Sequence, residues 1–187
     1  MKNILILGPG RAGKSTLSRM LKEKIPNYNL IHTDAIRNAI QFNLPCEYVE
    51  EFLNYKENNF FQKVLLNFLS EQSEQDKNSY GVILEGAQIL PETLSNYSDI
   101  DNTIVIYIGH GKLSKKELFE LVRKNDTEKD WSFYKTDVEL EEYINEFYEK
   151  HLYLKQECEK YGFNYIDTSN NRSEILNELV ENILKQI

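Results

Sequence analysis

Short apolar runs alternate along the chain with longer segments in which apolar residues recur every three or four positions. Each run ends near a glycine, a carboxylate or a polar stretch, and its length is typical of a strand. Five strands are expected, at residues 4–7, 29–32, 80–84, 103–108 and 163–166. Most of these runs lack alternating polar residues, which indicates strands that are covered on both faces.

The intervening segments have the periodicity of amphipathic helices. Helices are expected around residues 17–21 and 36–40, over 47–69 as one or two helices, and over 113–124, 138–161 and 173–187. The side chain of Thr33 or Asp34 could cap the second helix, and Pro45 would interrupt it. The polar stretch 71–79 is expected to be a loop.

Strands separated by helices predict an α/β fold with a mostly parallel sheet, helices on both faces and right-handed crossovers. In such a fold, ligands bind at the carboxyl ends of the strands. A chain of 187 residues is long enough to bury one core, so residues 1–187 are expected to form a single domain.

Charge and composition narrow the classes of partner. The chain has 22 Lys and Arg residues against 30 Asp and Glu residues, and its net charge of −8 disfavours nucleic acid and anionic lipid as partners. No apolar run reaches the roughly 18 residues of a membrane helix, and no signal-peptide pattern occurs. Cys46 and Cys158 form no metal-ligand pattern. These features predict a cytoplasmic protein with reduced thiols, as a monomer or a homodimer.

The segment after the first strand fits the phosphate-loop pattern G-x-x-x-x-G-K-[ST] at every fixed position. Its residues are Gly8, Pro9, Gly10, Arg11, Ala12, Gly13, Lys14 and Ser15, and Thr16 follows on the helix. In such a loop, backbone N–H groups hold the phosphates, the lysine reaches the β- and γ-phosphates, and the serine hydroxyl binds Mg²⁺. The sequence therefore predicts that ATP and Mg²⁺ bind here, with Lys14 and Ser15 as principal ligands.

A carboxylate for the metal is expected at the end of the third strand. Glu85 directly follows the apolar run 80–84, so it is the best candidate to hold Mg²⁺ together with Ser15. The alternative is a strand-end glutamate in solvent. The guanine-recognition motif N-K-x-D is absent, which disfavours a GTPase.

Asp34 and Arg37 lie three residues apart at the start of the second helix, and therefore on one face of that helix. The helix starts at the carboxyl end of the second strand, the edge that faces the phosphate loop. Asp34 is a candidate to take a proton from an acceptor hydroxyl, and Arg37 to bind an anionic group of the acceptor. The alternative is a capping residue followed by an exposed arginine.

These motifs resemble the nucleoside-phosphate kinase branch of P-loop proteins, to which adenylate, shikimate and gluconate kinases belong. Residues 33–37 look like the acceptor-site segment of that branch, residues 85–88 like the segment that closes its third strand, and residues 165–169 like the loop beside the nucleotide base. The resemblance implies a P-loop NTPase three-layer sandwich, with a five-stranded parallel sheet in the order 2-3-1-4-5.

The resemblance also implies a helical acceptor-binding insert at about residues 42–73 and a mobile lid at about residues 110–136. Within the lid, Arg123 is the candidate to reach the transferring phosphoryl group. By the same resemblance, Glu85 and Gln88 would contribute to binding the substrate. The chain departs from adenylate kinases in its supply of arginines, because Gln88 has no arginine beside it and Arg123 is the lone arginine of the lid region.

The sequence as a whole predicts a kinase that transfers the γ-phosphate of ATP to a small-molecule acceptor, with a hydroxyl as the favoured acceptor group. A nucleoside monophosphate kinase and a nucleotide-binding regulatory module with little turnover remain alternatives. A kinase for polynucleotide 5′ ends is a third, disfavoured by the acidic charge. Because few arginines are expected to converge on the site, nucleoside monophosphates are expected to be poor acceptors.

Overall fold

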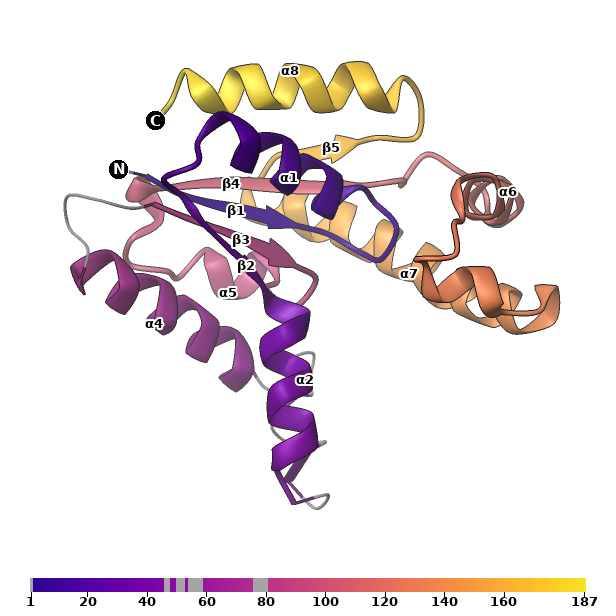
Figure 1. The fold of residues 1–187 in the computed structure, drawn as a ribbon, viewed down its shortest axis with the longest axis horizontal. Coiled ribbons are helices and arrows are strands. Elements are labelled where there is room, and N and C mark those ends of the chain that lie inside the picture. Colours follow the sequence, from indigo (N-terminus) through magenta and orange to yellow (C-terminus); the bar gives the residue numbers. More distant parts are fainter. Residues whose placement is uncertain (1, 46–47, 50–52, 54–58, 76–80) are drawn as a thin grey trace.

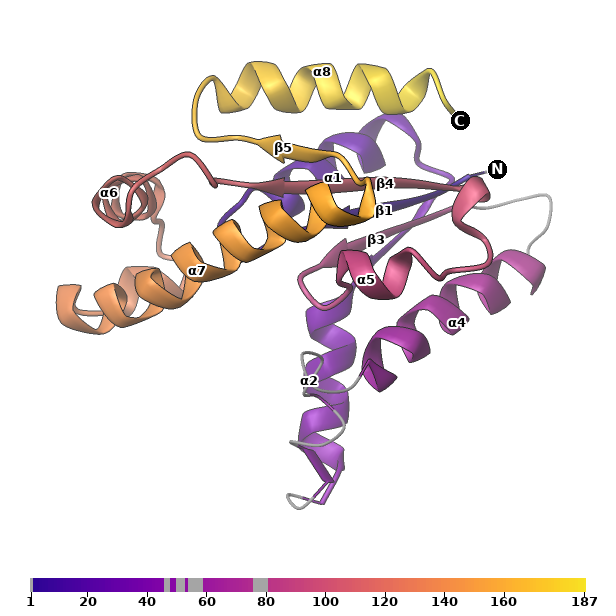
Figure 2. The same cartoon turned by 180° about the vertical axis from the view of Figure 1, so that it is seen from behind.

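The computed structural model describes the chain apart from residues 1, 46–47, 50–52, 54–58 and 76–80. Its five strands are β1 (Asn3–Leu7), β2 (Asn29–His32), β3 (Val82–Gly86), β4 (Thr103–Gly109) and β5 (Tyr165–Asp167). They form one parallel sheet in the order β2-β3-β1-β4-β5, drawn in Figures 1 and 2. The predicted fold class and strand order are therefore confirmed.

Helices cover both faces of this sheet (Figure 1). Those on one face are α1 (Lys14–Lys24) and α8 (Arg172–Leu184), and those on the other are α4 (Phe60–Gln75), α5 (Pro91–Leu94) and the long α7 (Asp137–Tyr161). The helix α2 (Thr33–Asn43) projects from the carboxyl end of β2, and α6 (Lys115–Asn125) follows β4. Two 3₁₀ turns, η1 (Ile100–Asn102) and η2 (Trp131–Tyr134), precede β4 and α7.

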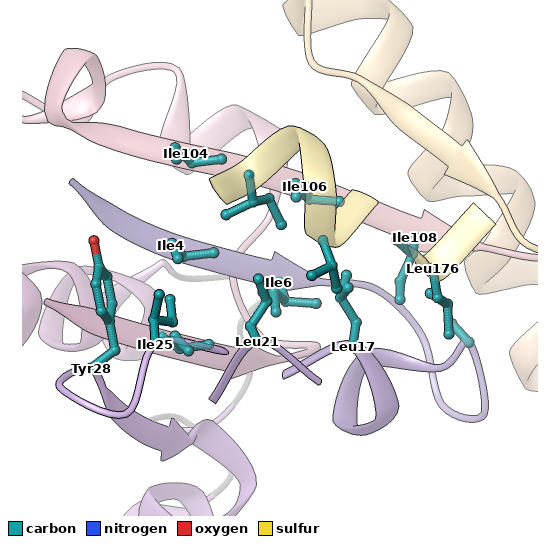
Figure 3. Packing of buried hydrophobic residues seen from close by; sticks show 14 residues of the cluster. Ile4, Ile6, Leu17, Leu21, Ile25, Tyr28, Ile104, Ile106, Ile108 and Leu176 are labelled. Atoms are coloured by element: carbon teal, nitrogen blue, oxygen red, sulfur yellow. The ribbon is translucent and has the colours of Figure 1, made fainter. Parts of the chain in front are cut away.

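Strand β1 lies in the centre of the sheet and is buried on both faces. Ile4 and Ile6 pack with side chains of α1 and α8, as Figure 3 shows for Leu17, Leu21 and Leu176. Leu5 and Leu7, which point to the opposite face, pack with side chains of α4, α5 and α7. These four of the five β1 side chains have no exposed surface. This burial fixes the strand whose end carries the phosphate loop.

Two local predictions were wrong. The stretch 71–79 was expected to be a loop, but α4 continues through its first half to Gln75. Neither Thr33 nor Asp34 caps α2, because the N-cap residue is His32 and makes no capping side-chain bond. The side chains of Thr33 and Asp34 instead bond to Gln88 on the loop after β3. Pro45 does follow the end of α2, as expected.

The expected acceptor insert at residues 42–73 lies partly outside the described residues. In the described part, α2 ends at Asn43 and α4 begins at Phe60. Cys158 of α7 is a free, buried thiol, and burial raises its pKa to about 12. Cys46 lies outside the described residues. No helix in the described part of the chain is long and apolar enough to cross a membrane.

Candidate active site at the carboxyl edge of the sheet

The loop between β1 and α1 has a backbone conformation that depends on glycine. Gly8 has φ 151° and Gly13 has φ 102°, both in the region that side chains disfavour. A Cβ atom at Gly8 would also lie 2.1 Å from the carbonyl oxygen of Ile108. Gly13 precedes the first helical residue of α1, so the unbonded N–H groups of the helix start face the loop. This geometry fits the anion-binding loop that the sequence predicts.

Lys14 lies inside this loop with only 9% of its surface exposed. Its Nζ atom donates a 2.7 Å hydrogen bond to the carbonyl oxygen of Pro9. Burial lowers the pKa of Lys14, and the nearby carboxylates of Glu85 and Asp34 oppose that shift. One lysine is thus placed within electrostatic reach of two carboxylates from different elements.

Glu85 and Ser15 are brought together, as expected for a pair of metal ligands. Ser15 Oγ donates a 3.1 Å hydrogen bond to Glu85 Oε1, and His32 Nδ1 contacts the same oxygen. Glu85 is 7% exposed, so it is not the solvated glutamate of the alternative interpretation. Hydroxyl and carboxylate oxygens suit Mg²⁺, which completes its shell with water and nucleotide oxygens. The described residues hold no cluster of three or more His, Cys, Asp or Glu side chains that would bind a metal alone.

Gln88 links the end of β3 to the start of α2. Its amide nitrogen donates a 2.6 Å hydrogen bond to Asp34 Oδ1, and its amide oxygen accepts from Thr33 Oγ1 and from the N–H of Ala87 at 3.1 Å. Thr33 and Gln88 are buried, whereas Asp34 is exposed. The contact requires Gly86, because a Cβ atom there would lie 1.6 Å from Thr33 Oγ1. The exposed carboxylate of Asp34 is therefore held from behind by a buried polar network.

The phosphate loop opens onto a cavity of about 390 Å³. Five of the side chains that line it are cationic and one is acidic: Arg11, Lys14, Arg19, Lys129 and Arg172, with Asp130. Cationic walls of this kind favour a polyanion such as a triphosphate. The expectation that few arginines converge here was wrong, because Arg19 and Arg172 join Arg11 around the loop.

Arg11 connects the phosphate loop to the expected lid. Its guanidinium group pairs with Asp126 at 2.9 Å and also with Asp130. Burial opposes ionisation of Asp130, but hydrogen bonds from Thr127 and the contact with Arg11 more than offset this, so the pKa of Asp130 lies below its ordinary value. The segment after α6 therefore closes one side of the cavity.

Arg123, the expected lid arginine, does not line this cavity. Its Nη2 atom bonds to Asp137 at 2.7 Å and to the carbonyl oxygen of Lys135 at 2.8 Å, and its Nη1 atom bonds to the carbonyl oxygen of Ser132 at 3.1 Å. These contacts fasten η2 and the start of α7 to α6. Action of Arg123 on a phosphoryl group stays a prediction that would require these bonds to break. Arg37, one turn along α2 from Asp34, is half-buried.

A cluster of buried polar side chains under the loop also supports the loop. Sequence analysis placed residues 165–169 beside the nucleotide base but did not predict these contacts. Thr168 donates a 3.0 Å hydrogen bond to the carbonyl oxygen of Ala12, and His110 Nε2 lies 3.2 Å from the carbonyl oxygen of Arg11. His151 Nδ1 accepts from the N–H of His110 at 3.0 Å. Burial lowers the pKa of both histidines, to about 3 for His151. Both rings therefore stay neutral around pH 7.

The fold is similar to that of two bacterial shikimate kinases. The enzyme from Bacteroides thetaiotaomicron gives a TM-score of 0.55 at 19% identity, covering 100% of this chain and 98% of that chain. The enzyme from Acinetobacter baumannii, solved with shikimate, gives 0.55 at 16% identity, covering 100% of this chain and 94% of that chain. A deoxyadenosine kinase from M. mycoides with bound dATP gives 0.44 at 24% identity, covering 99% and 100%.

No protein-family model matches the chain, and no curated protein matches it either. The chain thus has the fold of P-loop kinases, and the resemblance noted from its motifs is confirmed at the level of the fold. At identities below 20% for the two shikimate kinases, this likeness leaves substrate and residue roles to the geometry of the site itself.

Proposed function

We propose that this chain is a Mg²⁺-dependent kinase that transfers the γ-phosphate of ATP to a hydroxyl group of a small molecule. The observation that carries the proposal is the placement of Lys14, Glu85 and Asp34 at the carboxyl ends of neighbouring strands, where Ser15 bonds to Glu85 at 3.1 Å and Gln88 bonds to Asp34 at 2.6 Å. Phosphoryl transfer to a hydroxyl uses a cation at the terminal phosphates, a carboxylate that binds the metal and a carboxylate that accepts the proton of the acceptor. The kinase fold supports the reaction class.

In this proposal ATP lies along the phosphate loop with its phosphates in the cationic cavity. An adjoining cavity of about 600 Å³ receives the nucleoside, between α6 and the start of α8. Lys14 exchanges its bond to Pro9 for the β- and γ-phosphates. Ser15 and Glu85 would supply oxygen ligands to Mg²⁺, and the bound ion would neutralise charge on those phosphates.

The acceptor binds on the α2 side of the loop. Its hydroxyl oxygen forms a bond to the γ-phosphorus, the bond between that phosphorus and the β–γ bridging oxygen breaks, and ADP leaves. The hydroxyl proton passes to Asp34, whose orientation Gln88 fixes through the 2.6 Å bond. Arg37, on the same face of α2, binds an anionic group of the acceptor where one is present.

The test combines a binding measurement with an acceptor screen. Calorimetric titration with Mg·ATP should give saturable binding that Lys14→Ala weakens strongly, while Lys24→Ala, an exposed lysine at the far end of the same helix, binds like wild type. ADP release should then be measured against nucleosides, sugars, small hydroxy acids and nucleoside monophosphates.

Hydroxyl acceptors should be phosphorylated in preference to nucleoside monophosphates. Rapid phosphorylation of AMP, CMP, UMP, GMP or TMP, at about 1 to 100 per second, would instead indicate the nucleoside monophosphate kinase. ATP binding without transfer to any acceptor would favour the regulatory module. Equal ATP binding by wild type and Lys14→Ala would refute the assignment of the phosphate loop.

A further inference from the structure

Arg172 is the first residue of α8 and lies more than 150 positions from the phosphate loop in sequence, yet it rests against that loop. The Nε and Nη2 atoms of its guanidinium group lie 3.0 and 3.1 Å from the place where a Cβ atom of Gly13 would stand. Its Nη2 atom donates a 3.2 Å hydrogen bond to Thr16 Oγ1 on the first turn of α1. The guanidinium group thus covers the last glycine of the loop.

The chain before Arg172 holds it there. Thr168, with 1% of its surface exposed, bonds to the carbonyl oxygen of Ala12, so the loop after β5 docks on the phosphate loop four residues before Arg172. Asn171 then takes a left-handed conformation with φ 50°, which asparagine tolerates better than most residues, and α8 begins directly after it. Arg172 is therefore positioned by the fold rather than by a free surface conformation.

No carboxylate pairs with Arg172 among the described residues. Burial lowers the pKa of its guanidinium group, and the neighbouring Arg11 lowers it further. Arg11 also lines the phosphate cavity, but it is paired with Asp126 and Asp130, whereas Arg172 lines the same cavity without such a carboxylate partner in the described part of the chain. A half-buried guanidinium group of this kind favours an anionic ligand in the cavity.

The position of Arg172 indicates which part of the anion it meets. Ser15 faces Glu85, at the end where the metal and the terminal phosphates belong, whereas the next residue, Thr16, faces Arg172. Successive helical residues point about 100° apart, so the two contacts lie on different sides of the loop. Arg172 also lines both the phosphate cavity and the adjoining cavity proposed for the nucleoside. It stands at the junction between them.

We propose that Arg172 binds the α- and β-phosphates of the nucleotide, the phosphates nearest to the nucleoside, and so adds a ligand from the last helix to the phosphate loop. This rests on the proposed function, in that Mg·ATP is taken to occupy the loop. Because ATP and ADP share these phosphates, Arg172 contributes equally to the binding of both. It binds the nucleotide in the ground state, and its loss acts mainly on KM.

The experiment measures the affinities of Mg·ATP, Mg·ADP and inorganic tripolyphosphate for the full chain, for three variants at Arg172 and Lys185, and for Lys14→Ala. Arg172→Ala should weaken all three ligands by about tenfold to a hundredfold, the cost of one hydrogen-bonded charge contact. Arg172→Lys should recover part of the loss, because it restores the charge without the planar group. Lys185→Ala removes an exposed charge just after α8 and should bind like wild type. Thermal unfolding of each variant checks its folding.

Four results would overturn the proposal. Weakening of Mg·ATP alone, with Mg·ADP unchanged, would place Arg172 at the γ-phosphate. Weakening of both nucleotides without tripolyphosphate would place it at the nucleoside. Unchanged affinity in Arg172→Ala beside a clear loss in Lys14→Ala would leave the proposed function standing without Arg172. Unchanged affinity in both variants would remove the proposed function as well.

Discussion

Replacing Gln88 with leucine tests whether the polar network behind Asp34 serves catalysis. Leucine keeps a similar volume but removes the acceptor for Thr33 Oγ1, which is fully buried, and the donor to Asp34. An unsatisfied buried hydroxyl costs about 1 to 3 kcal/mol, so the free energy of unfolding should fall by that amount. Asp34 is exposed and stays hydrated, but it loses its fixed orientation. Misplacement of a catalytic group by about 1 Å can lower the rate roughly a hundredfold.

The assay is steady-state transfer to the best acceptor from the screen, together with Mg·ATP titration. For Gln88→Leu, kcat should fall about tenfold to a hundredfold while Mg·ATP affinity stays unchanged, because Gln88 does not line the phosphate cavity. Gln88→Glu is the discriminating variant. Its carboxylate can accept from Thr33, but it can donate to Asp34 only when the pair holds a proton.

The ratio of the Gln88→Glu kcat to the wild-type kcat should therefore rise as the pH is lowered from about 8 to about 6, whereas the corresponding ratio for Gln88→Leu should stay flat. A purely structural role of Gln88 predicts a loss of stability without the fall in kcat and without the pH dependence of the Gln88→Glu ratio. An unchanged kcat in Gln88→Leu, measured on protein that has lost the expected stability, would refute the reasoning.

Three further outcomes are expected. Asp34→Asn should lower transfer by about 10² to 10⁴ while leaving Mg·ATP binding intact; loss of binding in the titration would move Asp34 to the metal. The pKa of His151 is lowered to about 3 by burial, with further lowering by His110 and Lys14, while a histidine in the unfolded chain titrates near 6.5. Below about pH 6.5 the unfolded chain therefore binds one more proton than the folded chain does. As the pH is lowered from there, the free energy of unfolding measured with denaturant should fall by up to about 1.4 kcal/mol per pH unit, and less steeply in His151→Asn. Arg11→Ala should free the segment that carries Asp126 and Asp130, so its amide hydrogen exchange should accelerate relative to β1; unchanged exchange would show that Arg11 does not hold it.

The fold could be predicted from sequence because the continuous apolar residues of the central strands indicate that both faces are buried. Strand β1 is apolar on both faces and is followed at once by the glycines of the loop, so strand, loop and helix are all marked in one short segment. The end of α4 could not be read in the same way. Residues 71–75 are polar and were assigned to a loop, yet Glu and Gln are good helix formers. These polar residues therefore continue α4, which starts in the apolar segment before them.

The contacts of individual side chains were harder to predict, because they depend on distant elements. Thr33 has the residue type of a helix cap and stands where a cap is expected. It bonds instead to Gln88, which lies 55 residues further along the chain, since β2 and β3 are neighbours and Gly86 leaves room for the hydroxyl. Sequence spacing contains no sign of this pairing.

The positions of the arginines also depend on distant elements, and they affect which class of acceptor the site favours. Position in the sequence indicated that Arg123 binds the phosphates and gave Arg172 no role there. In the structure, Asp137 and two backbone carbonyl groups bind Arg123. Arg172 lines the phosphate cavity instead, because the start of α8 docks on the loop. Arg11, Arg19 and Arg172 therefore line the cavity that the proposed function assigns to the phosphates of ATP. On the side of α2, the described polar groups include Asp34, the amide of Gln88, Arg37 and His32 at the N-cap. One guanidinium group beside a carboxylate suits a hydroxyl acceptor with at most one anionic group, because a second phosphate would meet Asp34 without enough positive charge to offset the repulsion.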